Sequence, residues 1–274
     1  MKKKRQYGFI YFLLIILSIM VLYPFFFAII TSLKTVDEYA LNKLALPVVF
    51  YHGNYFRVLF TLNLLQYLTN TIITVAIGLV FYLLVCSTAG LAFGKFKFSG
   101  RLIIFSLVLF FMIFPQMVIA GELYQLLAKM KLLNTRTGII MAWVSYFAPF
   151  GTYIMTTYFT GVPREIIESA KMDNANVFQL FALIMLPIAK PMLGTIGIIG
   201  TLSMWNELPF SMLMLQNDNI RTLTIGITLL KGEYGLPIPS LSAAVIISSA
   251  VPFVLYLFFQ DFIAMNATAG SVKG

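Results

Sequence analysis

Charged residues divide the chain into long uncharged stretches. Five runs contain no Asp, Glu, Lys or Arg, and they extend over residues 6–33, 58–94, 102–121, 137–163 and 234–260. Each is at least as long as the ~20 residues with which a helix crosses the hydrocarbon core of a bilayer. A sixth apolar stretch, from about Pro191 to Leu215, is interrupted only by Glu207. The pattern predicts six transmembrane helices.

The second run is too long for one crossing, and its polar residues indicate where the helix begins. Asn63, Gln66 and Asn70 place its first part at the membrane interface, so we expect the helix to start near Thr71. The predicted spans are about 8–32, 71–94, 102–121, 138–159, 191–215 and 241–263. With no soluble domain between them, we expect an all-α integral membrane protein with one domain over residues 1–274.

Composition supports this class. Apolar residues make up 60% of the chain and charged residues 11%, against about 45–50% and about 25% in soluble proteins. Lys2, Lys3, Lys4 and Arg5 precede the first span, which places the N-terminus in the cytoplasm, and six crossings return the C-terminus there. The run that follows is far longer than the about 7–15 apolar residues of a cleavable signal. The net charge of +9 needs no nucleic acid, because cationic flanks face anionic lipid.

The loop between the fourth and fifth spans, residues 163–191, has the pattern of two short helices. Pro163 suits a first helical turn, and Glu165 and Glu168 in the early turns favour the helix dipole. Asp173 and Asn174 break the helix, since Asn tolerates the left-handed conformation, and either can cap a second helix beginning near Ala175. The element is either a cytoplasmic docking surface or a connecting loop with an amphipathic surface helix.

This loop resembles the EAA loop of ABC importer permeases, with its E-A-A-x-x-D-G-A and L-P-x-x-x-P patterns. ESAKMDNA at 168–175 and LPIAKP at 186–191 occupy them, with Ser169 in place of Ala and Asn174 in place of Gly. The resemblance implies the type I importer permease fold and a loop that couples to an ATPase. The implied coupling residues are Glu168, Ser169, Ala170, Asp173, Asn174, Ala175 and Phe178.

Further segments are similar to the carbohydrate-uptake permeases related to the maltose permeases. They are NTIIT from Asn70, AGLAFGKFKFSGR from Ala89, MIFPQM from Met112, KLLNTRTGII from Lys131, WNELPF from Trp205 and the terminus QDFIAMNATAGSVKG. The resemblance implies a second homologous permease, two cytoplasmic ABC ATPases, an extracytoplasmic solute-binding protein and a sugar or oligosaccharide substrate, in the cell membrane of a prokaryote. It also implies that the C-terminal tail, with Gly270, Lys273 and Gly274, reaches the ATPases.

The chain offers little chemistry of its own. The segment from Gly90 to Phe96 lacks the spacing and the hydroxyl of a phosphate-binding P-loop, so ATP and Mg²⁺ are expected on the partner ATPases and no cofactor on this chain. One cysteine, Cys86, forms no internal disulfide and no multi-cysteine metal site. His52 is the only histidine, so we expect no catalytic centre.

Glu207 is the one acid inside a predicted span, and such groups are candidates for function. Trp205 and Asn206 beside it suit a sugar site, which uses a flat apolar face and hydrogen-bonding partners. Gln116 and Asn70 complete the predicted translocation pathway. A position at the outer interface, or pairing with a helix carbonyl, is the alternative for Glu207.

Three other functions stay open. One is an ABC permease for a non-sugar solute such as glycerol-phosphate, a polyol or an amino acid. A secondary transporter would carry several intramembrane charges or broken-helix repeats. A membrane scaffold needs no polar lining and does not account for the EAA-like loop.

Overall fold

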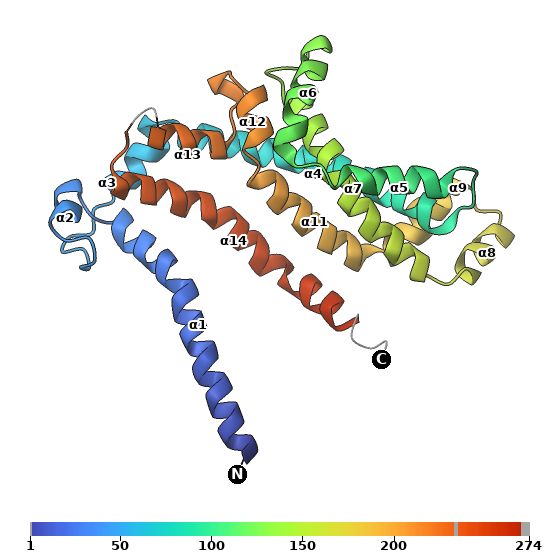
Figure 1. Cartoon of the computed structure of the whole chain (residues 1–274), viewed down its shortest axis with the longest axis horizontal. Helices are drawn as coiled ribbons and strands as arrows, with labels where there is room; N and C mark the ends of the chain where they lie inside the picture. The colour runs from blue at the N-terminus through green and yellow to red at the C-terminus, as the bar shows by residue number, and fades with distance from the viewer. Residues whose placement is uncertain (1, 233–234, 270–274) are drawn as a thin grey trace. The chain divides into compact units, whose positions relative to one another are not determined.

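The computed structural model describes residues 2–232 and 235–269, and within these ranges the regular structure is helical, with no strand (Figure 1). Contacts group the chain into two compact units. The first comprises Met1–Gln66 and Gly226–Val251, and the second comprises Tyr67–Ile225 and Pro252–Gly274. The predicted single domain over residues 1–274 stays a prediction.

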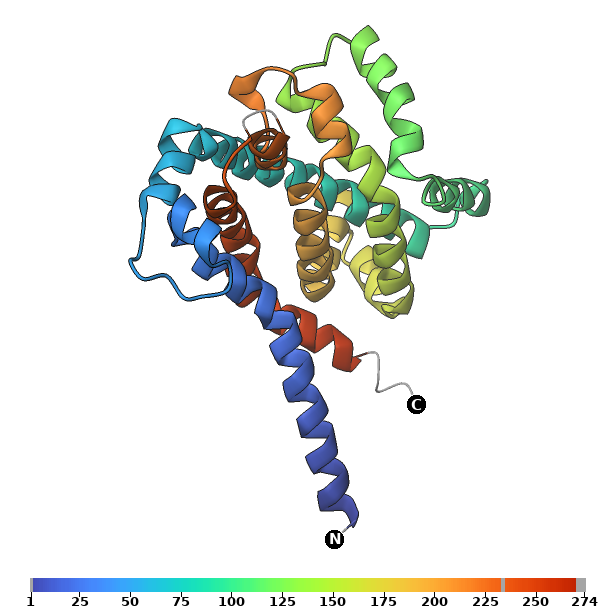
Figure 2. The same ribbon diagram turned by 60° about the vertical axis from the view of Figure 1, so that its left-hand side comes forward.

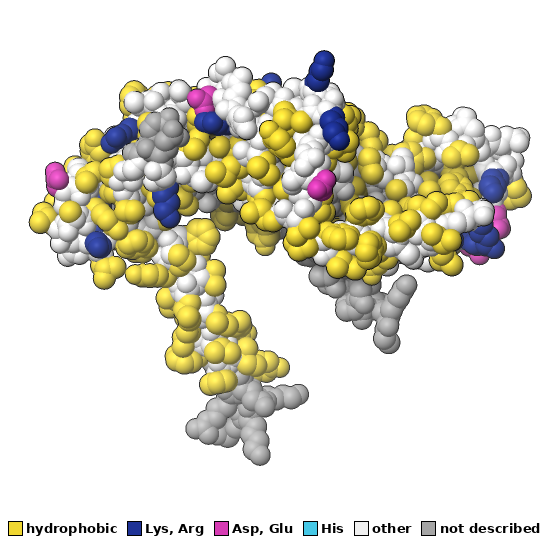
Figure 3. Space-filling view, turned by 45° about the horizontal axis from the view of Figure 1, so that its top comes forward, with side chains coloured by type: hydrophobic (Ala, Val, Ile, Leu, Met, Phe, Trp, Pro, Cys, Tyr) yellow, Lys and Arg dark blue, Asp and Glu magenta, His cyan; other side chains and the backbone are white. Residues whose placement is uncertain are grey.

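The first unit contains the N-terminal helix and short helices that follow it. Its elements are α1 (Lys2–Ser32), α2 (Val36–Leu41), α3 (Gly53–Phe56), the π-helix η1 (Arg57–Thr61), most of α13 (Leu223–Gly232) and the first part of α14 (Ile238–Ala269). Hydrophobic side chains cover α1 from Phe9 to Phe26 (Figure 3). A helix that exposes apolar residues on every side is typical of a membrane span.

The buried Asn54 joins three segments of this unit. Its Nδ2 donates to the carbonyl oxygens of Ser32, at 2.9 Å, and Lys34, at 2.7 Å, while Ser240 Oγ donates to its Oδ1 at 2.9 Å. The end of α1, the start of α3 and the start of α14 therefore meet at one satisfied amide.

The second unit contains the 163–191 loop and most of the remaining helices. They are α4 (Leu64–Lys95), which belongs to this unit from Tyr67 on, α5 (Arg101–Phe111), α6 (Gln116–Lys129), α7 (Arg136–Gly161), α8 (Glu165–Met172), α9 (Val177–Gln179), the π-helix η2 (Leu180–Met185), α10 (Leu186–Ile188), α11 (Lys190–Trp205), α12 (Pro209–Met214) and the 3₁₀-helix η3 (Asp218–Ile220). Helix α7 contacts α5, α6, α11 and α12.

Glycines let α4 approach α7 and α11 closely. A Cβ added at Gly90 would overlap Cβ of Met155, and one at Gly94 would lie 2.9 Å from Cβ of Phe159. A Cβ at Gly200 would lie 2.6 Å from Cε1 of Tyr82. Small residues at such crossings are how membrane helices pack, since lipid gives no hydrophobic drive for association.

Four helical segments are long and apolar enough to cross a membrane: Phe9–Ser32, Leu64–Lys95, Arg136–Gly161 and Ile238–Phe258. Two bent pairs bring the number to as many as six. Helices α5 and α6 meet at 106° (Figure 2), and the segments Val177–Ile188 and Lys190–Trp205 meet at 80°. The fold is therefore all-helical with four to six candidate spans.

The structure differs from continuous helices in two predicted spans. Within 102–121, α5 ends at Phe111 and Pro115 precedes α6. Within 191–215, α11 ends at Trp205 and α12 begins at Pro209. Proline lacks the N–H that would continue a helix and clashes with the preceding turn. The helix expected near Thr71 instead begins at Leu64, so Asn70 lies inside α4.

Candidate functional site

Two side chains hold the backbone directly before the 163–191 loop and near its end. Lys95, the last residue of α4, donates from Nζ to the carbonyl oxygen of Thr160, at 3.2 Å, and to that of Val162. Near the other end, Tyr158 Oη donates to the carbonyl oxygen of Ile188 at 2.7 Å. Because both contacts lead back to α4 and α7, a force on the loop would be transmitted to these long helices.

The predicted break between two helices is confirmed. Helix α8 ends at Met172, and Asn174 has a φ of 56°, the left-handed conformation that Asn tolerates. The N–H of Ala175 closes the turn on the carbonyl oxygen of Ala170 at 3.0 Å.

The predicted cap of the second helix is wrong. Asn176, rather than Asp173 or Asn174, caps it: Asn176 Oδ1 accepts from the N–H of Gln179, and Gln179 Oε1 accepts from that of Asn176, both at 2.9 Å. This reciprocal capping box delays the helix start to Val177. Asp173 and Asn174 form the turn that precedes it.

All but one of the predicted coupling residues are at least partly exposed. Glu168, Ser169, Asp173, Asn174 and Phe178 are exposed, Ala175 is partly exposed, and Ala170 is buried. Two apolar neighbours, Met172 and Val177, are 79% and 67% exposed, and Phe178 is 75% exposed. Charged side chains gather over α8 in Figure 3, at the right of the view. Carboxylates beside exposed large apolar residues are suited to a protein partner with a basic residue and an apolar pocket.

Glu207 lies at the break between α11 and α12 and is only 4% exposed. Its Oε1 accepts from Gln116 Nε2 and from the N–H of Phe210, both at 2.6 Å. Its Oε2 accepts from Trp143 Nε1 at 2.8 Å, the N–H of Ser211 at 3.0 Å and Ser211 Oγ at 2.6 Å. The carboxylate thereby joins α6, α7 and the first turn of α12.

These five hydrogen bonds fill the acceptor capacity of the two oxygens, which offer about four lone-pair sites. A solute hydroxyl could bind Glu207 only by displacing one of these donors. Sequence reasoning found Gln116 but missed Trp143 and Ser211. The signal for Trp143 was weak: a buried indole requires an acceptor for its N–H, but the sequence does not say which one.

Trp205 and Asn206, which precede Glu207 in the chain, differ in their exposure. Trp205 is 3% exposed, whereas Asn206 is exposed and its Nδ2 donates to the carbonyl oxygen of Leu202 at 2.9 Å. In a regular helix, Trp205 and Glu207 would lie about 200° apart and could not share a buried face. Both are buried here because the helix ends between them.

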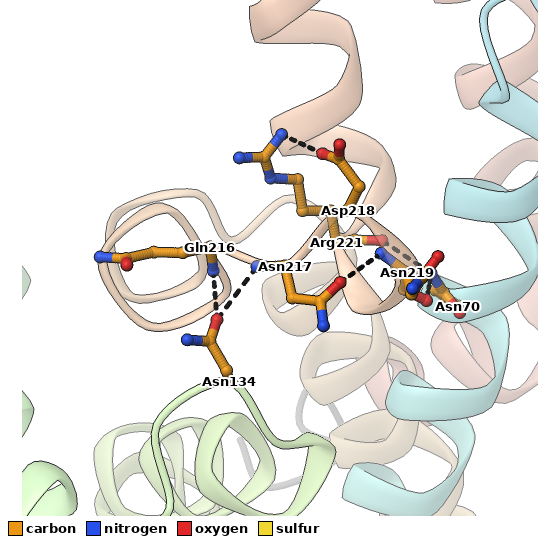
Figure 4. Close-up of polar contacts among 7 residues, drawn as sticks. All are labelled: Asn70, Asn134, Gln216, Asn217, Asp218, Asn219 and Arg221. Carbon is orange, nitrogen blue, oxygen red and sulfur yellow. Dashed lines mark hydrogen bonds and ion pairs between the residues drawn. The ribbon is translucent and has the colours of Figure 1, made fainter.

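Asn70, the remaining predicted pathway residue, lies in a different network (Figure 4). Its Oδ1 accepts from Arg136 Nη2 at 2.8 Å, and its Nδ2 donates to the carbonyl oxygens of Asn219, at 2.9 Å, and Arg221, at 3.2 Å. Asn70 thus ties α4 to the start of α7 and to the segment around η3. It does not contact Glu207.

A second asparagine, which the sequence analysis did not single out, fixes the other end of that segment. Asn134 has a φ of 55°, and its N–H donates to the carbonyl oxygen of Met214 at 2.9 Å. Its Oδ1 accepts from the N–H groups of Gln216, at 2.6 Å, and Asn217, at 3.0 Å (Figure 4). Asn134 therefore joins the connection from α6 to α7 with the connection from α12 to η3.

Gly270, Lys273 and Gly274 of the predicted tail lie outside the described residues.

Comparison with known proteins gives consistent matches over nearly the whole chain. The family described as "Binding-protein-dependent transport system inner membrane component" matches residues 86–266. A trehalose/maltose transport system permease protein of Thermococcus litoralis is 31% identical, over 95% of this chain and 94% of its own. An arabinooligosaccharides transport system permease protein of Bacillus subtilis is 30% identical, over 94% and 92%.

Solved structures show the same fold. A bacterial ABC transporter involved in the import of the acidic polysaccharide alginate contains a chain with a TM-score of 0.80 at 23% identity, covering 94% of this chain and 96% of that one. A second structure, of a bacterial alginate ABC transporter in complex with an alginate pentasaccharide-bound periplasmic protein, gives a TM-score of 0.69 at 15% identity.

Proposed function

Because the chain belongs to the family of inner membrane components of binding-protein-dependent transport systems, we propose that it is a permease subunit of an ATP-driven importer for a sugar or oligosaccharide. It is a multi-pass membrane protein of the inner membrane. The observation that carries the proposal is the family match over residues 86–266, which includes both the 163–191 loop and the Glu207 network. Relatives that cover almost the whole chain and carry oligosaccharide names support the substrate class.

The proposed membrane arrangement has six spans with both termini in the cytoplasm. The two bent pairs, α5 with α6 and the 177–205 segment, each contribute one span in addition to the four long helices, and α9, at the start of the 177–205 segment, lies at the cytoplasmic face. The N-terminal basic cluster supports the orientation. In this orientation the exposed surface of α8 and α9 faces the cytoplasm, and the Asn70 and Asn134 networks face the other side.

The proposed partners are a second homologous permease, two cytoplasmic ATPases that use ATP and Mg²⁺, and an extracytoplasmic binding protein. Glu168 pairs with a basic residue of one ATPase, and Phe178 fills an apolar pocket beside it. Since Lys95 joins α4 to the end of α7, and Tyr158 of α7 holds Ile188 near the end of the loop, movement of the ATPase would tilt the long helices and alternate access to a shared path. The tail residues Gly270, Lys273 and Gly274 are proposed to reach the ATPases as well.

In the pathway, the proposal assigns different roles to the predicted residues. Asn206 is exposed and can meet the solute. Glu207 and Gln116, together with Trp143, hold the break between α11 and α12 that presents Asn206, because the carboxylate is already saturated. Trp205 is buried at the end of α11 and packs beside the break. Asn70 fixes the loop around η3.

The coupling assignment is tested by reversing one exposed charge. Glu168→Lys should abolish co-purification of the ATPase subunits with the tagged permease and uncouple uptake, while membrane insertion and yield stay normal. Glu122→Lys, the same change at an exposed position of α6, is the matched control and should retain the subunits. Normal uptake and normal ATPase recovery with Glu168→Lys would contradict the assignment.

A further inference from the structure

The segment that follows α1 is irregular but tightly held by buried polar groups. Lys34 has no exposed surface, and its Nζ donates to the carbonyl oxygens of Asn42, at 3.0 Å, and Lys43, at 3.1 Å. A charge withdrawn from solvent in this way is costly unless it is hydrogen-bonded. The contacts close residues 34–43 into a loop.

Side chains of the loop also satisfy its own backbone. Glu38 Oε1 accepts from the N–H of Val48 at 2.5 Å, and Asn42 Oδ1 accepts from those of Leu44 and Ala45, both at 3.1 Å. Thr35 caps α2 through the N–H of Glu38 at 3.2 Å. Irregular backbone is tolerated near hydrocarbon only when its polar groups find internal partners, and this loop supplies several of them.

Asp37, Asn42 and Lys43 of the loop are exposed, and so are most of its large apolar side chains. Leu41 and Val48 are each 88% exposed. The other large apolar residues that the segment 36–50 exposes are Val36, Leu44, Leu46, Val49 and Phe50. A cluster of this kind on a rigid frame marks a surface that is covered in the native setting.

The end of α1 determines where this surface lies. The 24 residues from Phe9 to Ser32 have a helical length of ~36 Å at ~1.5 Å per residue, more than the ~30 Å hydrocarbon core. Leu33 therefore lies at a membrane interface. The N–H of Tyr51 donates to the carbonyl oxygen of Leu33 at 2.8 Å, which returns the far end of the loop to the same depth. This placement holds whichever side of the membrane the N-terminus occupies.

We infer that residues 36–50 form an interfacial anchor, which inserts Leu41, Leu44, Leu46, Val48, Val49 and Phe50 among the headgroups and upper acyl chains of the bilayer. The occupant is lipid because the apolar surface continues from the exposed residues Phe25, Phe26 and Ile29 of α1. The anchor fixes the depth of α1 and prevents its sliding along the membrane normal. The inference goes beyond the transport function, since it requires only that α1 spans the bilayer.

Depth-dependent quenching tests the anchor. In a Cys86→Ala background, Leu44→Cys or Val48→Cys is labelled with the fluorophore NBD in the full-length permease, with its co-purifying subunits, in phosphatidylcholine nanodiscs. Nitroxide lipids labelled near the headgroup should quench both positions several-fold more strongly than lipids labelled near the chain end, and aqueous iodide should quench weakly. Leu17→Cys, in the middle of α1, is the matched control and should show the opposite lipid dependence.

Two results would overturn the inference. Strong iodide quenching with no lipid dependence would show that the loop faces water. Shielding from iodide without quenching by any nitroxide lipid would show that a protein subunit covers the loop. The Leu17→Cys signal separates either result from a failure of α1 to insert.

Discussion

The indole nitrogen of Trp143 lies 2.8 Å from Oε2 of Glu207, across 64 positions of sequence. Both side chains are buried, so the bond is shielded from solvent. It links the first third of α7 to the point where α11 ends, so the break between α11 and α12 is part of the packing against α7. The geometry of the break therefore depends on α7 as much as on Pro209.

Removing Glu207 should cost more than removing any one of its donors. Glu207→Ala leaves Trp143 Nε1 and Ser211 Oγ without their acceptor, and each unsatisfied donor should lower the free energy of unfolding by about 1–3 kcal/mol. Trp143→Phe leaves four donors on the carboxylate. A double-mutant cycle of Trp143→Phe with Glu207→Ala should give a coupling of about 1 kcal/mol. Equilibrium unfolding in detergent micelles measures the loss of stability in each variant and the coupling energy. A coupling energy near zero would contradict the hydrogen bond between Trp143 and Glu207.

Two glycines should respond to alanine with opposite signs. At Gly90 a Cβ would overlap Met155 and lie 3.0 Å from that residue's backbone carbon, so Gly90→Ala should destabilise the protein by about 1–3 kcal/mol. At Gly121, inside α6, a Cβ meets nothing within 4 Å. Gly121→Ala should stabilise by about 0.5–1 kcal/mol through helix propensity. Thermal unfolding of the two variants in one detergent gives the comparison. Equal effects would show that α4 and α7 are not in close contact at Gly90.

Substitutions at Asn134 separate its backbone role from its side-chain role. Asn134→Gly keeps the positive φ but removes the acceptor for Gln216 and Asn217. Asn134→Ala loses the acceptor and adds about 1–2 kcal/mol of left-handed strain. Amide hydrogen exchange at Gln216 and Asn217 should therefore accelerate in both variants, and thermal stability should fall further in Asn134→Ala. Unchanged exchange in Asn134→Gly would show that the side chain does not hold the loop.

Thiol labelling should distinguish position 206 from position 203, one turn earlier on the same helix. In a Cys86→Ala background, Asn206→Cys should react with a membrane-impermeant reagent, and the rate should change when sugar or trapped ATP is present. Ser203→Cys, one turn earlier on α11, is the reference. If Asn206→Cys never reacts, or reacts equally in every state, Asn206 does not line the path.

Local features of the fold could be predicted where they depend on a few adjacent residues. Asn174 has the left-handed conformation that its side chain favours, and the break it makes follows from that. Prolines were less informative. Pro115 directly precedes α6 and Pro209 is the first residue of α12, whereas Pro149 lies inside α7 with no break. Which proline ends a helix depends on whether neighbouring helices stabilise a kinked one, and the sequence does not contain that information locally.

The functional residues, too, could be predicted from the sequence only where they lie next to one another in the chain. The exposed surface of α8 rests on contiguous residues, so a motif could locate it. Two of the partners of Glu207, Gln116 and Trp143, are 91 and 64 positions away, and only packing brings them to the carboxylate. A charge inside a span indicated that a partner was needed, but Trp143 could be identified only once α7 and α11 were placed.

The π-helix η2, from Leu180 to Met185, has a consequence for the direction in which the exposed surface of α8 and α9 faces. A π-turn holds one residue more than an α-turn, and each residue corresponds to about 100° around a helix. Deleting one residue from η2 would restore α-helical phase and rotate everything before it by about that angle relative to α11. Glu168 and Phe178 would then point in a different direction around the helix axis, although the two side chains themselves would be unchanged. The extra residue in η2 therefore determines the rotation of α8 and α9 about the helix axis relative to α11. The orientation of a partner bound to this loop would depend on the number of residues in η2 as well as on the side chains of the loop.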